Sequence, residues 1–355
     1  MDALSQGSGN GLLAVPTLEL TDGLGAFVAF VLSFAVVLVL MPCLIRKMRA
    51  GGMVGKDVNK KSKTEVAELG GIAALFAFSV SLSFVVGLQK LLGTVAEPPF
   101  LAAISVFFMA AMIGLIDDIS NIRQRLKVVV LAFAALPLML VHLGPEIIDL
   151  PFGYSVDFAG SMYFVYWIVL VPIGVTGLAN AVNMSAGYNG LESEQVAIIA
   201  GSILVIAFLR NLSSHTLLIL ATLVGSAIGL FYFNRYPAKV FIGDVGTMGL
   251  GAAIAAGVIL GHLEFYGVIA ILPAFYEAFA TVYYGARGKN GQRRRACHDP
   301  ILLKDGRLRP AAGAEHYTLA NVILSKRPMD ERTLVRVLLG LYALSGLGAV
   351  LLSVL

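Results

Sequence analysis

The chain has few charged residues and almost no cysteine. Asp, Glu, Lys and Arg make up 14% of its 355 residues, against roughly 25% in soluble globular domains. Hydrophobic residues account for 58%, and apolar runs of roughly 20 residues, the length that an α-helix needs to cross a bilayer, recur along most of the chain. This composition excludes a soluble globule and indicates an integral membrane protein.

The two cysteines, Cys43 and Cys297, lie far apart in basic sequence. We place both in the cytoplasm, where thiols stay reduced, so no disulfide is expected. The first 22 residues carry three acidic residues and no basic one. They lack the positive region of a signal peptide, so we expect the first span to remain in the mature protein.

Several catalytic and binding signatures are also missing. The sequence has no Walker A motif and no kinase glycine loop, so a nucleotide would be held in another way. The five histidines are too scattered for a zinc site, and no Ser/His/Asp hydrolase is indicated. No second domain is visible and no nucleic-acid partner is expected. Residues 1–355 are therefore predicted to form a single integral membrane domain.

Ten apolar segments are predicted to form membrane-spanning helices, which makes the fold class an all-α polytopic membrane protein. They are residues 23–45, 70–92, 100–116, 128–143, 162–181, 193–209, 216–233, 246–261, 265–284 and 333–354. If successive helices alternate in direction, the connections after the odd-numbered helices share one side and hold 23 of the 26 Lys and Arg residues. By the positive-inside rule that side is cytoplasmic, so residues 1–22 are external.

Two connections are expected to contain β-hairpins or turns. The cytoplasmic segment 286–332 carries Asp305 and Gly306 between two short apolar and basic stretches, which predicts a hairpin with a type I′ turn. The external loop at 144–161 contains two prolines and is expected to be a polar turn, with a short hairpin as the alternative.

Two adjacent carboxylates, Asp117 and Asp118, end the third apolar segment. Placing one unpaired carboxylate at bilayer depth costs roughly 2.5 to 3.5 kcal/mol. The bases that follow, Arg123, Arg125 and Lys127, suggest that the pair lies at the membrane edge. In the simplest interpretation the two aspartates are solvated partners of Arg123 and Lys127.

Other polar residues on the same predicted side also have simple structural explanations. Asp244 could cap the helix that it begins, and Asn189 with Glu192 could form a capping box. The basic runs could serve as topology signals and lipid-headgroup contacts. The remaining intramembrane charge, Glu277, could mark an ion or substrate path or be hydrogen-bonded inside the bundle.

The coincidence of these groups on one face favours a shared chemical role. Carboxylate and amide oxygens are ligands of the kind that Mg²⁺ prefers, and Mg²⁺ usually bridges one or two carboxylates to substrate phosphates. Lys and Arg bind phosphate oxygens. The residues therefore indicate phosphoryl chemistry at a membrane surface.

The ordered motifs of the chain resemble those of the polyprenyl-phosphate N-acetylhexosamine-1-phosphate transferases. Within that superfamily they are most similar to the UDP-N-acetylglucosamine:dolichyl-phosphate N-acetylglucosamine-1-phosphate transferases. The motifs are KDVNK at 56–60, GLIDD at 114–118, GYNGLE at 187–192, NRYP at 234–237, VFIGD at 240–244, GVILGH at 257–262 and YTLANVI at 317–323.

The resemblance implies transfer of N-acetylglucosamine 1-phosphate from UDP-GlcNAc to a polyprenyl or dolichyl phosphate. UMP is released and a lipid-linked diphosphate sugar is formed for glycan assembly, as in protein N-glycosylation. It also implies Mg²⁺ as cofactor, with Mn²⁺ as an alternative, and a multi-pass protein of the cell membrane or endoplasmic reticulum membrane with a cytoplasmic active site. We expect direct in-line attack by the lipid phosphate; a covalent intermediate on an aspartate stays open.

The resemblance assigns a role to each matching residue. The catalytic positions are Asp117, Asp118 and Lys127; the metal ligands are Asn183 and Asp244; the donor-binding positions are Val58, Glu68, Gly187, Asn189 and Phe241; and the diphosphate-binding positions are Lys60, Arg295 and His298.

One departure from the family pattern leaves the sugar open. The eukaryotic-type enzymes carry an Arg-His-Arg arrangement in the last cytoplasmic loop, whereas this chain reads RRRACHD at 293–299. His298 is the natural counterpart, but the second arginine contact is open. Another UDP-N-acetylhexosamine therefore remains an alternative donor. An undecaprenyl phosphate is the alternative acceptor, and a homodimer is possible. An ion-coupled transporter using Asp117, Asp118 and Glu277 is disfavoured, because transporter sites usually lie near the midplane between inverted repeats, and no repeat is apparent.

Overall fold

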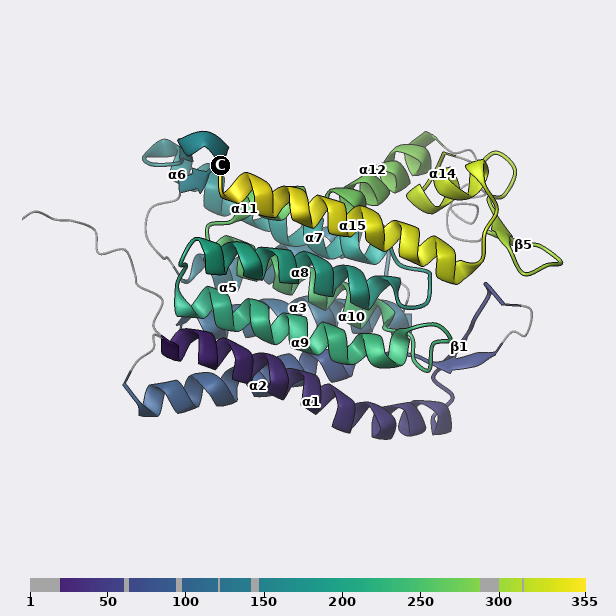
Figure 1. Ribbon diagram of the computed structural model, residues 1–355, viewed down its shortest axis with the longest axis horizontal. Helices are drawn as coiled ribbons and strands as arrows, with labels where there is room; N and C mark the ends of the chain where they lie inside the picture. The colour runs from purple at the N-terminus through teal and green to yellow at the C-terminus, as the bar shows by residue number, and fades with distance from the viewer. Residues whose placement is uncertain are drawn as a thin grey trace, which may run out of the picture.

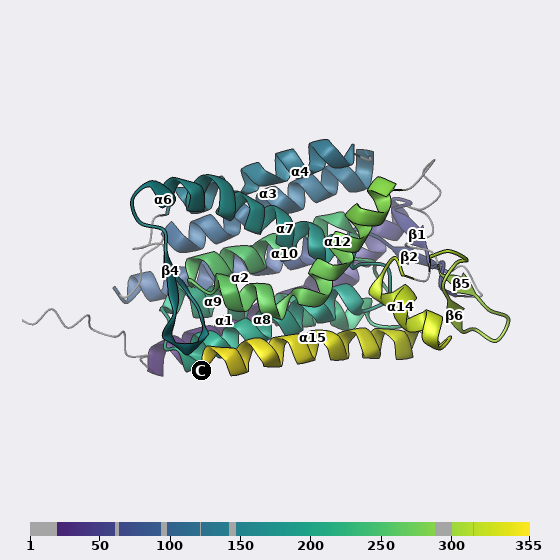
Figure 2. The same ribbon diagram turned by 90° about the horizontal axis from the view of Figure 1, so that it is seen from above.

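Long, roughly parallel helices form an elongated bundle in the computed structural model (Figures 1 and 2). The structure describes residues 20–60, 64–93, 98–120, 122–141, 147–287, 300–314 and 316–355. Its longer helices are α1 (Leu20–Ala50), α2 (Gly71–Leu91), α3 (Pro98–Ser120), α7 (Val171–Met184), α8 (Leu191–Leu209), α9 (Ser214–Asn234), α10 (Gly243–Leu260), α12 (Leu272–Arg287) and α15 (Glu331–Ser353).

Shorter elements connect or extend these helices. They are α4 (Gln124–Ala132), η1 (Phe133–Ala135), α5 (Leu136–Met139), η2 (Pro151–Gly153), α6 (Ser161–Val165), the π-helix η3 (Tyr166–Leu170), α11 (Glu264–Ala270) and α14 (Leu319–Lys326). Three two-stranded antiparallel sheets pair β1 (Val54–Lys56) with β2 (Glu65–Ala67), β3 (Ile147–Asp149) with β4 (Ser155–Asp157), and β5 (Ile301–Leu302) with β6 (Leu308–Arg309).

The helices confirm an all-α polytopic membrane protein. Within the described residues, eight helices are long and apolar enough to cross a membrane, and α11 with α12, bent by 73°, gives a ninth candidate. The expected span at 128–143 is instead the succession α4, η1 and α5 over residues 124–139. At 1.5 Å per residue this succession covers about 24 Å, short of the ~30 Å of a bilayer core.

Helix α10 forms the centre of the bundle (Figure 2). Of its 18 residues, 89% are buried inside the protein. Small residues let the neighbouring helices approach closely. A Cβ on Gly249 would lie 2.4 Å from the Phe107 ring of α3, and one on Gly251 would lie 2.6 Å from the Leu178 carbonyl oxygen of α7. The middle of α10 therefore packs closely against the middle of α3 and of α7.

The hairpins divide between the two ends of the bundle. Strands β1, β2, β5 and β6 lie with α14 at one end, here called the site end, whereas β4, α6 and the C-terminus lie at the other (Figures 1 and 2). The connections after the first and ninth expected spans therefore share one end, as alternation of the helices predicted. The hairpin alternative for 144–161 is confirmed by β3 and β4.

The hairpin expected around Asp305 and Gly306 is confirmed, but its turn type is not I′. A type I′ turn needs positive φ at both central residues. Here Gly306 has φ 90°, whereas Asp305 is not among the residues with positive φ. The Leu303 carbonyl accepts from the Gly306 amide at 3.0 Å, and Asp305 accepts from the Arg307 amide at 3.0 Å. The Arg307 side chain also donates to Asp305 and lowers the pKa of that carboxyl.

Candidate active site

Lys127 lies between two carboxylates that come from different helices. Its Nζ is 2.5 Å from Asp117 Oδ2, at the end of α3, and 2.6 Å from Asp244 Oδ2, in the first turn of α10. The Lys127 side chain is only 2% exposed. Burial opposes its charged form, but the carboxylates, Asp244 foremost, outweigh burial and raise the pKa of the ammonium. A charged lysine therefore joins α3, α4 and α10 at the site end.

Asp118 caps α10 although it belongs to α3. Its Oδ1 accepts from the Asp244 amide at 2.8 Å and its Oδ2 accepts from the Val245 amide at 3.0 Å. These are the amides that a helix N-terminus leaves without an internal partner. The interpretation that Asp244 caps its own helix is therefore wrong, because Asp118 takes that role and leaves the Asp244 carboxylate to face Lys127.

Two glycines make this arrangement possible. A Cβ on Gly114 would lie 2.3 Å from the Asp244 carbonyl oxygen, so any side chain there would push α3 away from α10. Gly243 has φ +74°, and a Cβ on it would lie 2.8 Å from Asp118 Oδ2. Both glycines belong to motifs identified in the sequence, GLIDD at 114–118 and VFIGD at 240–244.

Asp117 uses both of its carboxylate oxygens. Oδ2 accepts from Lys127, and Oδ1 accepts from the Ile122 amide at 2.7 Å. The expected partner Lys127 is thus confirmed for Asp117, whereas Asp118 pairs with backbone amides instead of a base.

Asn183 brings the end of α7 to the same point. Its Nδ2 donates to Asp244 Oδ1 at 2.7 Å and to Thr247 Oγ1 at 2.8 Å. In the part of the chain that the structure describes, no group of three or more His, Cys, Asp or Glu side chains is arranged to hold a metal ion by itself. A Mg²⁺ site needs only one or two carboxylates, since waters and substrate phosphates complete it. The oxygens of Asp244, Asn183 and Thr247 fit such an ion.

A cavity of about 230 Å³ opens beside Asp244. Four of the expected donor-binding residues line it: Val58, Gly187, Asn189 and Phe241. Glu68 lies next to it, because a Cβ on Gly55 would be 2.2 Å from Glu68 Oε1 and 3.3 Å from the Phe241 ring. Backbone bonds fix Phe241: its amide donates to the Ala67 carbonyl at 2.7 Å, and its carbonyl accepts from the Gly70 amide at 2.9 Å.

Buried Asp57 ties two walls of this cavity together. Its Oδ2 accepts from Asn189 Nδ2 at 2.9 Å and from Lys60, whose Nζ also lies 4.5 Å from the centre of the Tyr236 ring. Asn59 Nδ2 donates to the Gly187 carbonyl at 3.0 Å. Sequence reasoning gave Asp57 no role, although it stands inside the KDVNK motif, which was the available signal. Lys60 is not among the residues that line the cavity.

The expected capping box of Asn189 and Glu192 is wrong. The Asn189 side chain donates to Asp57, and its amide donates to Glu331 at 2.9 Å. Glu192 accepts from the Gly187 amide at 2.8 Å instead. Both residues hold the loop before α8 in the cavity wall.

Glu277 is buried and anchors α14. Its Oε1 accepts from the Leu319 amide, the first of that helix, at 2.8 Å. The interpretation that Glu277 is hydrogen-bonded inside the bundle is confirmed. Arg295 and His298 lie outside the described residues, so their roles in diphosphate binding stay predictions.

Comparison with known proteins agrees with this geometry. Residues 100–262, which contain the carboxylates, Lys127 and Asn183, match the model of glycosyl transferase family 4. A protein of Methanocaldococcus jannaschii, provisionally named a glycosyltransferase, is 30% identical over 92% of this chain and 96% of its own length. The chain belongs to this family. The resemblance to the polyprenyl-phosphate N-acetylhexosamine-1-phosphate transferase superfamily is thereby confirmed, and the protein is a membrane-embedded transferase.

Two further relatives carry more specific names. A protein of Saccharolobus solfataricus, provisionally named UDP-N-acetylglucosamine–dolichyl-phosphate N-acetylglucosaminephosphotransferase, is 32% identical over 70% of this chain and 74% of its own length. The phospho-N-acetylmuramoyl-pentapeptide-transferase of Streptococcus mutans is 29% identical over 64% of this chain and 70% of its own length. The two names describe different sugars, so similarity alone leaves the donor open.

Proposed function

We propose that the protein transfers N-acetylglucosamine 1-phosphate from UDP-GlcNAc to a polyprenyl phosphate of the dolichyl type, on the cytoplasmic face of the membrane. The products are UMP and a lipid-linked N-acetylglucosamine diphosphate. The observation that carries the proposal is the Asp117–Lys127–Asp244 bridge beside a cavity of about 230 Å³. A buried cation and oxygen ligands there suit two phosphorylated substrates. The name of the archaeal relative supports the choice of sugar and lipid.

The cavity takes the uridine end of the donor. Phe241 offers a ring face on which uracil can stack, and the Asp57–Asn189 bond keeps the opposite wall in place. Asn183 and Asp244 would hold Mg²⁺, or Mn²⁺, with the donor diphosphate. When bound, that ion neutralises the diphosphate and stabilises UMP as the leaving group.

Lys127 receives the acceptor phosphate. That phosphate is already ionised near pH 7 and needs little help from a general base. One of its oxygens attacks the β-phosphorus in line and forms the new P–O bond. The bond from the β-phosphorus to the bridging oxygen breaks, and its electron pair leaves with UMP.

Direct transfer fits the aspartates better than a covalent intermediate. Both oxygens of Asp117 accept hydrogen bonds, from the Ile122 amide and from Lys127, and both oxygens of Asp118 accept from the first amides of α10. A carboxylate held on both oxygens is a poor nucleophile, because attack would break one of these bonds.

The test is release of UMP by the purified full-length protein. We expect release only when UDP-GlcNAc and a polyprenyl phosphate are both present, and we expect EDTA to abolish it and excess Mg²⁺ to restore it. A panel of UDP-N-acetylhexosamines with dolichyl and undecaprenyl phosphates then identifies the donor and acceptor. Release of UDP in place of UMP would indicate glycosyl transfer and contradict the proposal.

A further inference from the structure

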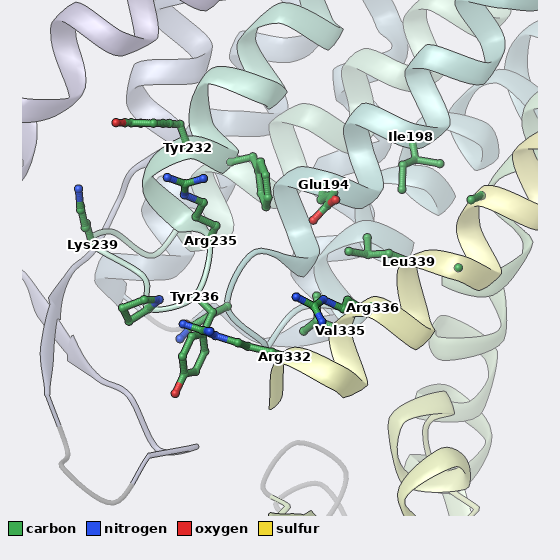
Figure 3. A pocket seen from close by; sticks show the side chains of 15 residues that line it. Glu194, Ile198, Tyr232, Arg235, Tyr236, Lys239, Arg332, Val335, Arg336 and Leu339 are labelled. Carbon is green, nitrogen blue, oxygen red and sulfur yellow. The ribbon is translucent and has the colours of Figure 1, made fainter. Parts of the chain in front are cut away.

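A second and larger groove, of about 770 Å³, opens between α8, the end of α9 and α15 (Figure 3). It lies at the site end but is separate from the cavity beside Asp244, here called the donor cavity. Among the described residues, only Asn189 lines both. The mechanism proposed above gives this groove no role.

One part of the groove is strongly basic. Arg235, Lys239, Arg332 and Arg336 line it, and among the lining residues that the structure describes Glu194 is the only carboxylate. Within the described ranges, none of these four cations forms an ion pair. Aromatic rings lie beside three of them: Arg235 and Lys239 are 4.9 Å and 5.9 Å from the centre of the Tyr232 ring, and Arg332 is 4.4 Å from the centre of the Tyr236 ring. Such uncompensated, preorganised charge suits an anion.

The other part of the groove is apolar. Ile198 on α8 faces Val335 and Leu339 on α15 (Figure 3), and Gly340 and Ala343 continue this wall. Positions 332, 336, 339 and 343 lie three or four residues apart, so they share one face of α15. That face runs from arginine at the helix start to small and apolar residues one to three turns later.

We propose that this groove binds an anionic phospholipid of the surrounding bilayer. The phosphate lies among Arg235, Arg332 and Arg336, and an acyl chain follows the apolar wall along α15. Charge complementarity and the polar-to-apolar order along one helix face select an amphiphile over a free anion. The acceptor lipid of the proposed reaction is a poorer fit, because Lys127 and Asp244 do not line the groove.

Lipid binding can be measured on the purified full-length protein by native mass spectrometry, without turnover. Phosphatidylglycerol and phosphatidylcholine with identical acyl chains are titrated separately. We expect phosphatidylglycerol to bind about tenfold more tightly, and the double variant Arg332→Gln with Arg336→Gln to lose that preference. The matched control is Arg46→Gln with Arg49→Gln, which removes two exposed arginines from the end of α1, outside the groove. The control should keep the preference.

A second variant tests the acyl-chain part. A Cβ on Gly340 would meet no atom within 4 Å, so Gly340→Leu should fold normally and fill the groove. We expect it to weaken phosphatidylglycerol binding about tenfold. Gly348→Leu is the control, because Gly348 is equally open and lies on the same helix but outside the groove.

Three outcomes would overturn the proposal. Equal affinity of the wild-type protein for both lipids would remove the anionic preference. Unchanged binding in Gly340→Leu, with inorganic phosphate displacing the lipid, would reduce the groove to an anion site. Loss of a dimer peak in these variants, with lipid binding intact, would assign the groove to a second copy of the chain. Each outcome is independent of whether UMP is released.

Discussion

Lys127 has the least replaceable position of any side chain in the site. It is buried, and its ammonium bridges Asp117 and Asp244, whose carboxylates also lie within reach of each other. Removing the cation from a buried pair leaves an uncompensated charge, which typically costs about 3 to 5 kcal/mol. The same ammonium is the phosphate contact in the proposed reaction, so we expect Lys127 to serve both structure and activity.

Replacing Lys127 should affect the acceptor step most. We expect Lys127→Ala to lower kcat/KM for the lipid phosphate about 100-fold or more, equal to roughly 2.7 kcal/mol of transition-state stabilisation. The measurement is UMP release at limiting polyprenyl phosphate. Arg125→Ala is the control, since Arg125 is an exposed base two residues away, and it should change the rate less than about twofold. An unchanged rate in Lys127→Ala would exclude the proposed phosphate contact.

Asp118 is expected to act by positioning α10. Asp118→Asn keeps one oxygen acceptor of the two that the Asp244 and Val245 amides use. We expect it to lower the free energy of unfolding by about 1 to 2 kcal/mol and to reduce turnover in part. Thermal melting and UMP release measure the two effects together.

The control for Asp118 is Asp305→Asn, which removes a carboxylate from the exposed hairpin. It should leave turnover unchanged. An Asp118→Asn protein with wild-type melting but no turnover would show that Asp118 contacts the reacting atoms, and the positioning role would then be wrong.

At the scale of elements, the site depends on how closely α3 and α10 approach. Gly114 on α3 lies against the Asp244 backbone, and Gly71 on α2 lies against Gly246, where an added Cβ would be 2.1 Å from its Cα. Two helices, α2 and α3, thus converge on the first turn of α10 because glycine occupies each contact. The carboxylate of Asp118 reaches the α10 amides only at this separation.

A methyl group at Gly114 should therefore disable the site by displacing α10. Gly114→Ala places a Cβ 2.3 Å from the Asp244 carbonyl oxygen, so α10 must shift. We expect a loss of about 1 to 3 kcal/mol in stability and a large loss of turnover. Gly87→Ala is the control: Gly87 lies in α2 with no atom near an added Cβ, so it should be neutral or gain up to about 1 kcal/mol. Full activity of Gly114→Ala would contradict the close approach.

For the whole molecule, the bundle has two chemically different ends. The site end carries the hairpins β1–β2 and β5–β6, together with α14 and most of the described basic residues, whereas the opposite end carries β3–β4 (Figures 1 and 2). From the positive-inside rule we propose that the basic end faces the cytoplasm. A nucleotide sugar would then be available to the donor cavity directly.

Cysteine labelling tests this orientation. In a Cys43→Ser, Cys297→Ser background, a membrane-impermeant maleimide should label Ser155→Cys in β4 on intact cells. It should label Asp305→Cys in the β5–β6 turn only after the membrane is permeabilised. Labelling of Asp305→Cys on intact cells would place the candidate active site outside and remove the cytoplasmic assignment.

Composition and motifs were sufficient to predict the class of fold and most residues of the candidate site. Apolar runs of membrane length are local properties of the chain, so most of the helices could be predicted from them. The exception is residues 124–139, whose helical segment is shorter than a bilayer core is thick. The Asp305-Gly306 pair correctly predicted a hairpin but not the type of its turn. In the turn that forms, the Arg307 amide and side chain donate hydrogen bonds to Asp305. The motifs correctly gathered Asp117, Lys127, Asn183 and Asp244 on one face.

Only the tertiary structure decided which group each of these residues contacts. Local rules gave Asp244 and Asn189 capping roles, yet Asp118 caps α10 from 126 residues away and Asn189 bonds Asp57 from 132 residues away. Capping preferences describe neighbours along the chain, whereas these contacts depend on how closely separate helices pack. The bridge through Lys127 has the same origin: three helix ends meet because glycines allow it, and no single segment of the sequence contains that information.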